Sequence, residues 1–163
     1  LPMARAFAAY ATSGWTKMAL QAFCAQHNIS AEQQRAWWPG GIRSVAWDMN
    51  AAADEEMERH WLHGAPTFAA IFEQCFKANE SLRASVGHLA KSDLFHPFNT
   101  IARTAETVRR MQALRGLHTN AWRTGRLVAA YSAAVLVWVG DSSETGTRTA
   151  RASAAFLALV GLR

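Results

Sequence analysis

The stretch that decides the fold runs from Trp122 to Val139 and reads WRTGRLVAAYSAAVLVWV. Its first turn is basic and polar, whereas the part from Leu127 onward carries no charged side chain. Apolar side chains cover nearly every direction around such a helix, which predicts a helix in the centre of a bundle. The apolar part is shorter than the about 20 residues that a membrane-spanning helix needs. Its largest side chains recur at the spacing of one helical face: Leu127, Tyr131, Val135 and Trp138.

The composition predicts a single all-α domain over residues 1–163. A chain of 163 residues buries roughly 70% of the surface that its unfolded state exposes. Good helix formers dominate, and the sequence has no alternating β-branched run that would predict a strand. Cys24 and Cys75 form no CxxC motif, so we expect two reduced, buried thiols. The chain begins at Leu1 rather than Met, as expected after removal of a mitochondrial targeting segment or after trimming.

Helix-breaking and capping residues divide the chain into a head (residues 1–41) and a helical body (42–163). Ser30 and Gln33 predict a capping box at the start of a short helix, and Pro39-Gly40-Gly41 breaks that helix. Residues 80–90 are expected to form a helix or a short break, and 91–97 a loop. The expected helices cover residues 2–12, 15–27, 31–38, 42–63, a segment from 66 through 76, 98–114, 122–139 and 147–162.

The charge is unevenly distributed between the two parts of the chain. Residues 1–106 carry 9 Lys and Arg against 10 Asp and Glu, a net charge of −1, whereas residues 107–163 carry 8 Arg against 2 acidic residues, a net charge of +6. A basic surface beside an apolar helix favours anionic lipid headgroups, nucleic acid or an acidic protein surface, and is also typical of a face kept basic for solubility.

The head has the plan of a helix-turn-helix unit, with a tight turn at residues 27–30 between its second and third short helices. Its third helix makes a poor DNA reader, because Glu32 would repel phosphates and Trp37 and Trp38 are bulky. The basic charge also lies in the other half of the chain. We therefore do not expect sequence-specific DNA binding.

A series of short motifs resembles the lipid-binding accessory proteins of ubiquinone (coenzyme Q) biosynthesis, whose fold is that of TetR regulators. The resemblance begins at Gly14-Trp15-Thr16 with Ala19-Leu20. It continues through Trp38-Pro39-Gly40-Gly41, residues 82–90, Thr104-Ala105, residues 122–131, Asp141-Ser142-Ser143 and Phe156-Leu157. It covers most of the chain, and the order of the motifs carries it.

The resemblance implies a TetR-like helical bundle with a degenerate helix-turn-helix head. Such a protein is non-enzymatic and usually forms a dimer with itself or with a similar chain. It holds an isoprenoid or phospholipid in an apolar cavity. It also contacts an anionic membrane surface and has a di-iron hydroxylase as its partner. This places it on the matrix face of the mitochondrial inner membrane, or on the membrane in a bacterial cytoplasm. The partner-facing patch would be Trp122, Arg123, Thr124 and Arg126.

Two groups of apolar residues allow two interpretations each. The first group either lines the lipid cavity or forms ordinary core: Phe68, Phe72, Phe76, Leu127, Tyr131 and Val135. The second belongs to a last helix that either lies on an anionic membrane or packs against a partner chain: Arg148, Arg151, Phe156, Leu157 and Val160.

Departures from the family pattern suggest an alternative function. The approach to Trp122 carries no carboxylate, Arg123 stands where the family has Tyr, and Gly125 where it has a basic residue. These changes are expected if the same fold serves as a structural subunit of a mitochondrial inner-membrane complex, such as ATP synthase.

The sequence shows none of the common catalytic motifs. It contains no Gly-x-Ser-x-Gly, no P-loop and no paired Glu-x-x-His of a di-iron bundle. Glu56, His60 and His63 share one helix face at a spacing that would suit a metal ion, but they are also typical of a polar helix end. We expect no enzyme and no metal.

Overall fold

A computed structural model describes residues 2–93, 97–143 and 146–162 of the chain. Within these ranges the protein is all-helical and contains no strand, which confirms the predicted all-α class. The elements are α1 (Pro2–Tyr10), α2 (Lys17–Gln26), α3 (Ala31–Trp37), α4 (Ile42–His60), α5 (Phe68–Ala78), the 3-10 turn η1 (Glu80–Leu82), α6 (Arg83–Asp93), α7 (Pro97–Leu114), α8 (Ala121–Val139) and α9 (Thr147–Leu159).

Side-chain caps explain where several helices begin. Ser30 Oγ accepts a hydrogen bond from the backbone N–H of Gln33 at 3.1 Å, and Gln33 Oε1 accepts one from the N–H of Ser30 at 2.8 Å. This is the predicted capping box, and it satisfies two amides that the first turn of α3 leaves unpaired. Thr16, Thr67 and Asn120 cap α2, α5 and α8 through single side-chain oxygens.

Three helices end two or three residues earlier than the sequence predicts: α1 at Tyr10, α4 at His60 and α9 at Leu159. The ends of α2 and α3 each come one residue early. At the end of α9, Gly161 has a φ of +68° and the N–H of Leu162 bonds back to the carbonyl of Leu157 at 2.8 Å. This left-handed cap closes the helix three residues before the predicted end. The predicted loop at 91–97 is wrong at its start, because α6 continues to Asp93, and its residues 94–96 lie outside the described ranges.

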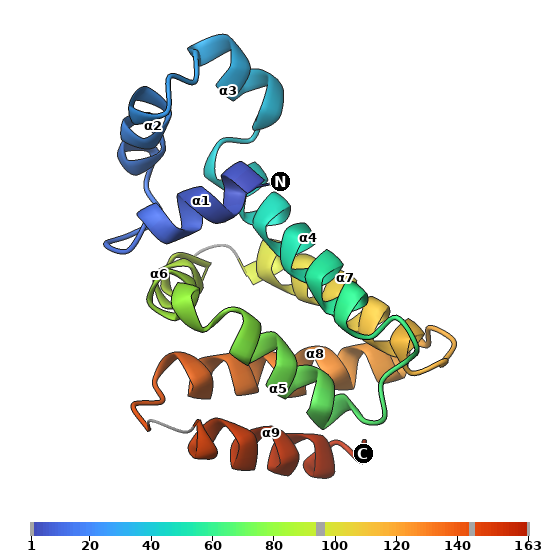
Figure 1. Cartoon of the computed structure of the whole chain (residues 1–163). Coiled ribbons are helices and arrows are strands. Elements are labelled where there is room, and N and C mark those ends of the chain that lie inside the picture. The colour runs from blue at the N-terminus through green and yellow to red at the C-terminus, as the bar shows by residue number, and fades with distance from the viewer. Residues whose placement is uncertain (1, 94–96, 144–145, 163) are drawn as a thin grey trace.

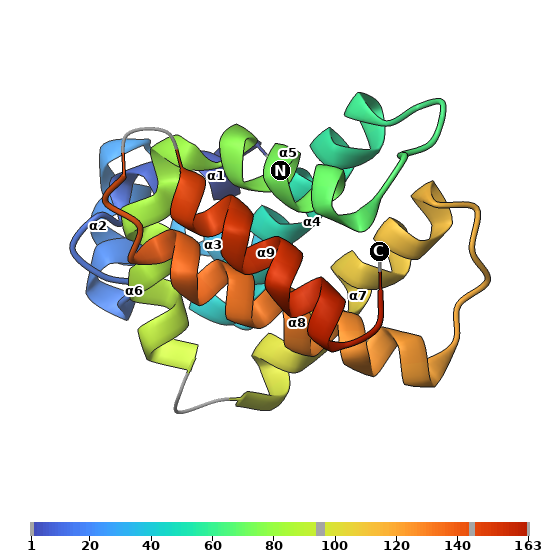
Figure 2. The ribbon, with the colours of Figure 1, turned by 90° about the horizontal axis from the view of Figure 1, so that it is seen from below.

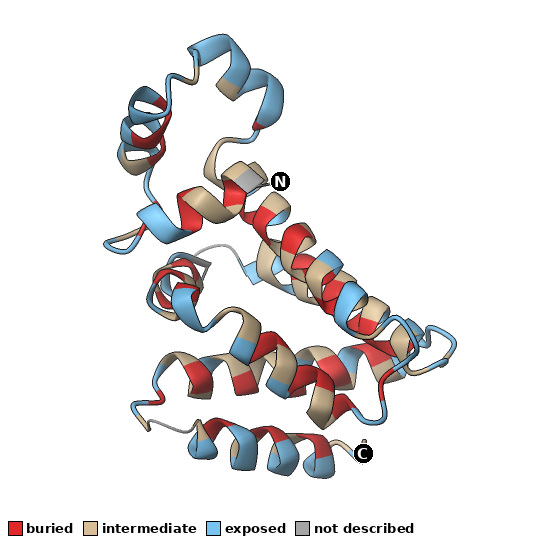
Figure 3. Ribbon diagram, viewed as in Figure 1, coloured by how far each residue is buried: buried red, intermediate tan, exposed pale blue. Residues whose placement is uncertain are grey.

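The head consists of α1, α2 and α3, and α2 and α3 project from the rest of the molecule (Figure 1). Phe7 and Phe23 are fully buried in a core that also includes parts of α4 and α6. The indole Nε1 of Trp15 donates to Ser85 Oγ at 2.9 Å, which ties the head to α6. No side chain of α3 is buried, and Figure 3 shows α3 exposed over most of its length.

The body is built around α8, which lies along α9 and also contacts α5, α6 and α7. Figure 2 shows α9 lying against α8 and beside α5. Leu127, Ala134 and Trp138 of α8 are buried in the body core with the apolar face of α5. Val86 of α6 packs against both this core and that of the head, so the two cores meet there.

One strip of α8 remains open, contrary to the prediction of a helix covered on all sides. Trp122 is 75% exposed and Leu136 is 64% exposed. The helices α5, α6, α7 and α9 contact the other sides of α8, so α8 is central to the body but is open to solvent along this strip. None of the described helices combines the length and the apolarity that crossing a bilayer requires.

Candidate functional site

An inner cavity of about 140 Å³ lies between α4, α5, α6, α7 and α8. One side of it is a run of stacked rings. The rings of Phe76 and Tyr131 lie parallel with centroids 5.8 Å apart, and Phe76 stacks on Trp138 at 5.3 Å. These rings come together because α5 and α8 each place an aromatic side chain every one or two turns on the facing side.

The opposite end of the inner cavity is polar. Arg103 of α7 is only 6% exposed and lines both this cavity and a neighbouring hollow of about 170 Å³. Thr100 also lines the cavity, and its hydroxyl oxygen is buried without a hydrogen-bond partner among the described residues. The inner cavity therefore offers an apolar, aromatic side and a polar end, the layout that suits an amphipathic molecule.

The polar atoms on the aromatic side of the cavity are electrically neutral at ordinary pH. Burial raises the pKa of the Cys75 thiol to about 12, and the nearby Asp54 adds to the effect. Burial also raises the pKa of the Tyr131 hydroxyl, which is hydrogen-bonded to Cys75, well above its ordinary value. A protonated thiol is a poor nucleophile, so Cys75 contributes apolar surface rather than chemistry.

Asp54 of α4 is only 3% exposed. It belongs to a network of hydrogen bonds and charges that joins α4 to α7. Thr107 Oγ1 donates to its carboxylate at 2.9 Å, Asn50 Nδ2 lies 3.2 Å from it, and Arg110 Nε is 3.8 Å away. Burial raises the pKa of Asp54 to about 7, against the opposing effects of Thr107 and Arg110. The network fixes the walls of the cavity and holds a carboxyl that titrates near neutral pH.

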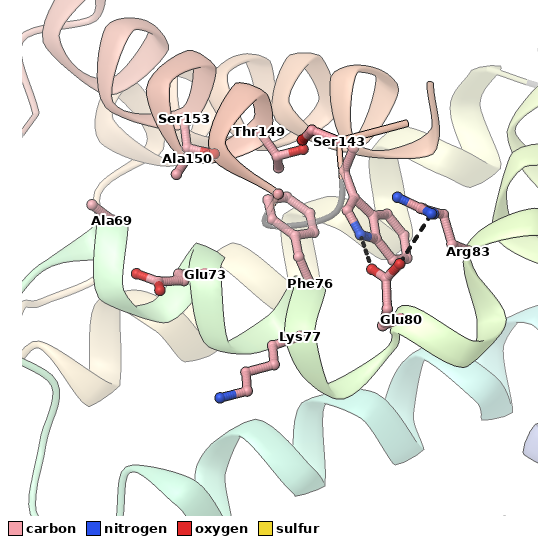
Figure 4. Close-up of a pocket in the computed structure, with 12 residues that line it drawn as sticks. Ala69, Glu73, Phe76, Lys77, Glu80, Arg83, Ser143, Thr149, Ala150 and Ser153 are labelled. Carbon is pink, nitrogen blue, oxygen red and sulfur yellow. Dashed lines mark hydrogen bonds and ion pairs between the residues drawn. The ribbon is translucent and has the colours of Figure 1, made fainter. Parts of the chain in front are cut away.

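An outer cleft of about 460 Å³ lies on the other side of the Phe76 and Trp138 rings, between α5 and α9 (Figure 4). Both rings line both spaces. Glu80 fixes the position of the Trp138 ring. Its Oε2 accepts a hydrogen bond from Trp138 Nε1 at 2.9 Å, and its Oε1 lies 3.2 Å from Arg83 Nη2. The stacked rings of Phe76 and Trp138 therefore stand at the boundary between the inner cavity and the outer cleft.

The candidate lipid-binding residues divide into two groups. Phe76, Tyr131 and Val135 line the inner cavity. The other three fill solid core, each at most 2% exposed, and do not line the cavity: Phe68, Phe72 and Leu127.

Of the candidate partner patch, Trp122 is exposed, and Arg123 and Arg126 are half-buried. Trp122 projects into solvent with Arg126 over its ring at 5.8 Å, and Arg123 donates to the carbonyl of His118 at 3.1 Å. Thr124 does not belong to this surface. It is 8% exposed and accepts a hydrogen bond from Gln112 Nε2 at 2.9 Å, inside the contact between α7 and α8.

The candidate membrane-contact residues do not share one face of α9. Arg148 and Arg151 are exposed, but Leu157 is 2% exposed in the body core. Phe156 and Val160 are half-buried and pack against the same core. Near the end of α9, Leu157 therefore faces its own chain, whereas Leu159 is 83% exposed.

The residues weighed as a metal site are separated by other contacts. Glu56 Oε2 lies 2.6 Å from Arg5 Nη1, His60 packs against the ring of Trp61, and His63 falls in the turn after α4. Within the described ranges, no three His, Cys, Asp or Glu side chains are close enough together to hold a metal ion.

Sequence reasoning missed the whole outer cleft. Its polar residues Glu73 and Ser153 stand on helices far apart in the chain, and the only local signal is the run of small residues along one side of α9. Comparison of the chain with models of known protein families, with curated proteins and with solved structures finds no match. The fold and the site define an all-helical protein with an aromatic-walled cavity and an adjoining cleft.

Proposed function

We propose that the chain is a non-enzymatic binding protein for an isoprenoid-type lipid or a similar amphipathic molecule, related in fold to TetR regulators and in role to the ubiquinone-biosynthesis accessory proteins. The observation that carries the proposal is that Phe76, Tyr131 and Val135, chosen from the sequence, line one cavity. The three short helices ahead of the long α4 support the TetR-like arrangement.

The chemistry of the inner cavity supports an uncharged, partly aromatic guest. Its thiol and phenol are protonated, its stacked rings offer flat apolar surface, and the hydroxyl of Thr100, which has no hydrogen-bond partner among the described residues, lies at one end. At about 140 Å³ the cavity is smaller than the roughly 300 Å³ at the lower end of small-molecule sites. Only one end of an isoprenoid would occupy it unless the walls move.

Organic extraction of protein purified from membranes, followed by mass spectrometry, tests the proposal. We expect a stoichiometric isoprenoid or phospholipid in the wild type and its loss in Val135→Trp, because the larger ring fills the cavity. Leu136→Trp is the matched control, since Leu136 is the next residue and is 64% exposed. A wild-type protein without lipid, or equal lipid in both variants, would contradict the proposal.

A second candidate function is that of a structural subunit of a mitochondrial inner-membrane complex such as ATP synthase. The observation that favours it is the exposed apolar surface on α8 and α9, where Trp122 is 75% and Leu159 is 83% exposed. An exposed Trp flanked by Arg is typical of an interface anchor. On native gels, a subunit would migrate with a large assembly without bound lipid, and Trp122→Ala would release it.

A further inference from the structure

The outer cleft has a polar end that the lipid proposal does not use. Glu73 of α5 and Ser153 of α9 lie at the same end of the cleft, with Ala69 and Ala150 beside them (Figure 4). The volume of the cleft, about 460 Å³, falls within the range of roughly 300–1,000 Å³ that is typical of small-molecule sites.

Ser153 is the first sign that this end is a binding site. The residue is only 4% exposed, and its hydroxyl oxygen has no hydrogen-bond partner within the described part of the chain. A serine inside a helix usually bonds to a backbone carbonyl of the preceding turn or points to solvent. A buried hydroxyl that does neither leaves a hydrogen-bonding group unsatisfied, which is unfavourable until a ligand pairs with it.

The charges around Ser153 define what such a ligand must carry. Glu73 makes no hydrogen bond or ion pair with another described residue, so its negative charge is available. The cleft is also lined by two cationic side chains. Arg83 is held by Glu80 and by the carbonyl of Asp141, and Lys77 points away from α9 in Figure 4. Glu73 is therefore the charged side chain that lies at the same end of the cleft as Ser153, with Lys77 one turn further along α5.

We propose that the outer cleft binds a small molecule that carries a protonated amine on an apolar or aromatic body. An ammonium group is a cation with three hydrogen-bond donors, so it can pair with a carboxylate such as that of Glu73 and donate to a hydroxyl oxygen such as that of Ser153. The body of the ligand packs on Ala69, Ala150 and the outer faces of Phe76 and Trp138. An anionic ligand should not bind there, because its charge has the same sign as that of Glu73. A neutral alcohol should bind more weakly, because it forms no ion pair with Glu73.

Nuclear magnetic resonance titration of the full ¹⁵N-labelled chain with benzylammonium, at neutral pH and low salt, tests the proposal. The signals to follow are the amides of Ala150 and Ser153 and the indole N–H of Trp138. We expect saturable shifts with a Kd of about 1 mM or tighter, as a good eight-atom ligand achieves. Benzyl alcohol should bind at least tenfold more weakly, and benzoate should give no saturable shift.

Matched variants separate recognition by the cleft from general charge effects. Glu73→Gln should weaken benzylammonium at least tenfold, whereas Glu55→Gln, an exposed carboxylate on α4, should leave its Kd unchanged. Ser153→Ala should weaken it at least threefold and leave the melting temperature unchanged or higher, because an unsatisfied hydroxyl is removed.

Three results would overturn the assignment. The first is that benzoate or benzyl alcohol competes equally well in the titration. The second is that benzylammonium shifts only amides outside the cleft, and the third is that Glu73→Gln binds it as the wild type does. A Ser153→Ala variant with a lower melting temperature and unchanged affinity would equally show that the hydroxyl serves packing alone. Glu73 and Ser153 line the outer cleft and not the inner cavity, so their variants test this proposal separately from the lipid proposal.

Discussion

Replacing Asp54 by Asn should make the protein more stable at pH 8, and by a smaller margin at pH 5. The carboxyl is 3% exposed, and burial raises its pKa from 3.8 to about 7 despite the hydrogen bond from Thr107 and the guanidinium of Arg110 at 3.8 Å. Because one pKa unit is about 1.4 kcal/mol, the rise corresponds to about 4 kcal/mol between the protonated and ionised forms in the folded state.

The sign follows from where the proton is bound. Below pH 3.8 both the folded and the unfolded chain carry the proton on Asp54, whereas between pH 3.8 and about 7 only the folded chain keeps it. The free energy of unfolding therefore falls as pH rises through this window, by up to about 1.4 kcal/mol per pH unit, and levels off above pH 7. Asn mimics the protonated form and lacks this loss, so we expect Asp54→Asn to exceed the wild type by about 2–4 kcal/mol at pH 8.

Urea denaturation followed by tryptophan fluorescence, from pH 4.5 to pH 8.5, measures this difference. Comparing variant with wild type at each pH cancels the contributions of the other titrating groups, including the His residues. Glu55→Gln, an exposed carboxylate on the same helix, is the control and should follow the wild type throughout. If Asp54→Asn is less stable than the wild type at pH 8, the pairing with Arg110 outweighs burial and the reasoning fails.

Three further predictions follow from single contacts. A Cβ on Gly87 would lie 2.7 Å from Val139 Cγ1, so Gly87→Ala should lower the free energy of unfolding by about 1–3 kcal/mol, and Val139→Ala in the same chain should restore it in a double-mutant cycle. Hydrogen bonds from Ser143 and Thr149 hold the pKa of Asp141 below its usual range, so Asp141→Ala should lower the melting temperature at pH 7, and the difference from the wild type should shrink at pH 3 because the stabilisation is lost as pH falls. Leu157→Ala should cost about 2–5 kcal/mol in urea denaturation, whereas the same change at the exposed Leu159 should cost less than about 0.5 kcal/mol.

Local signals explain which parts of the fold the sequence could predict. The capping box at Ser30 involves residues three apart, and its hydrogen bonds are those expected. The end of α9 was misplaced because the apolar pattern continues to Leu162, while the left-handed turn at Gly161 stops the helix before it. A periodic pattern shows that a helix has an apolar side and does not show where its last turn closes.

The site was predicted in part for a related reason. The spacing of large side chains places Phe72 and Phe76 on one face of α5, but only Phe76 meets the inner cavity, because the other is covered by packing from α8. Thr124 looked like part of a surface patch, and the partner that buries it, Gln112, stands on another helix. Ser153 and Glu73 come to line the same cleft only because α5 packs against α9, and no local sequence pattern encodes that packing.

The ring pair of Phe76 and Trp138 lines both the inner cavity and the outer cleft, so the two compartments share one boundary. Any guest that pushes the rings toward one compartment takes room from whatever occupies the other. Thermodynamic reciprocity then requires antagonism of equal strength in both directions: the factor by which a molecule outside weakens one inside is the factor by which the inner molecule expels the outer. Loading one compartment is thereby a means of emptying its neighbour.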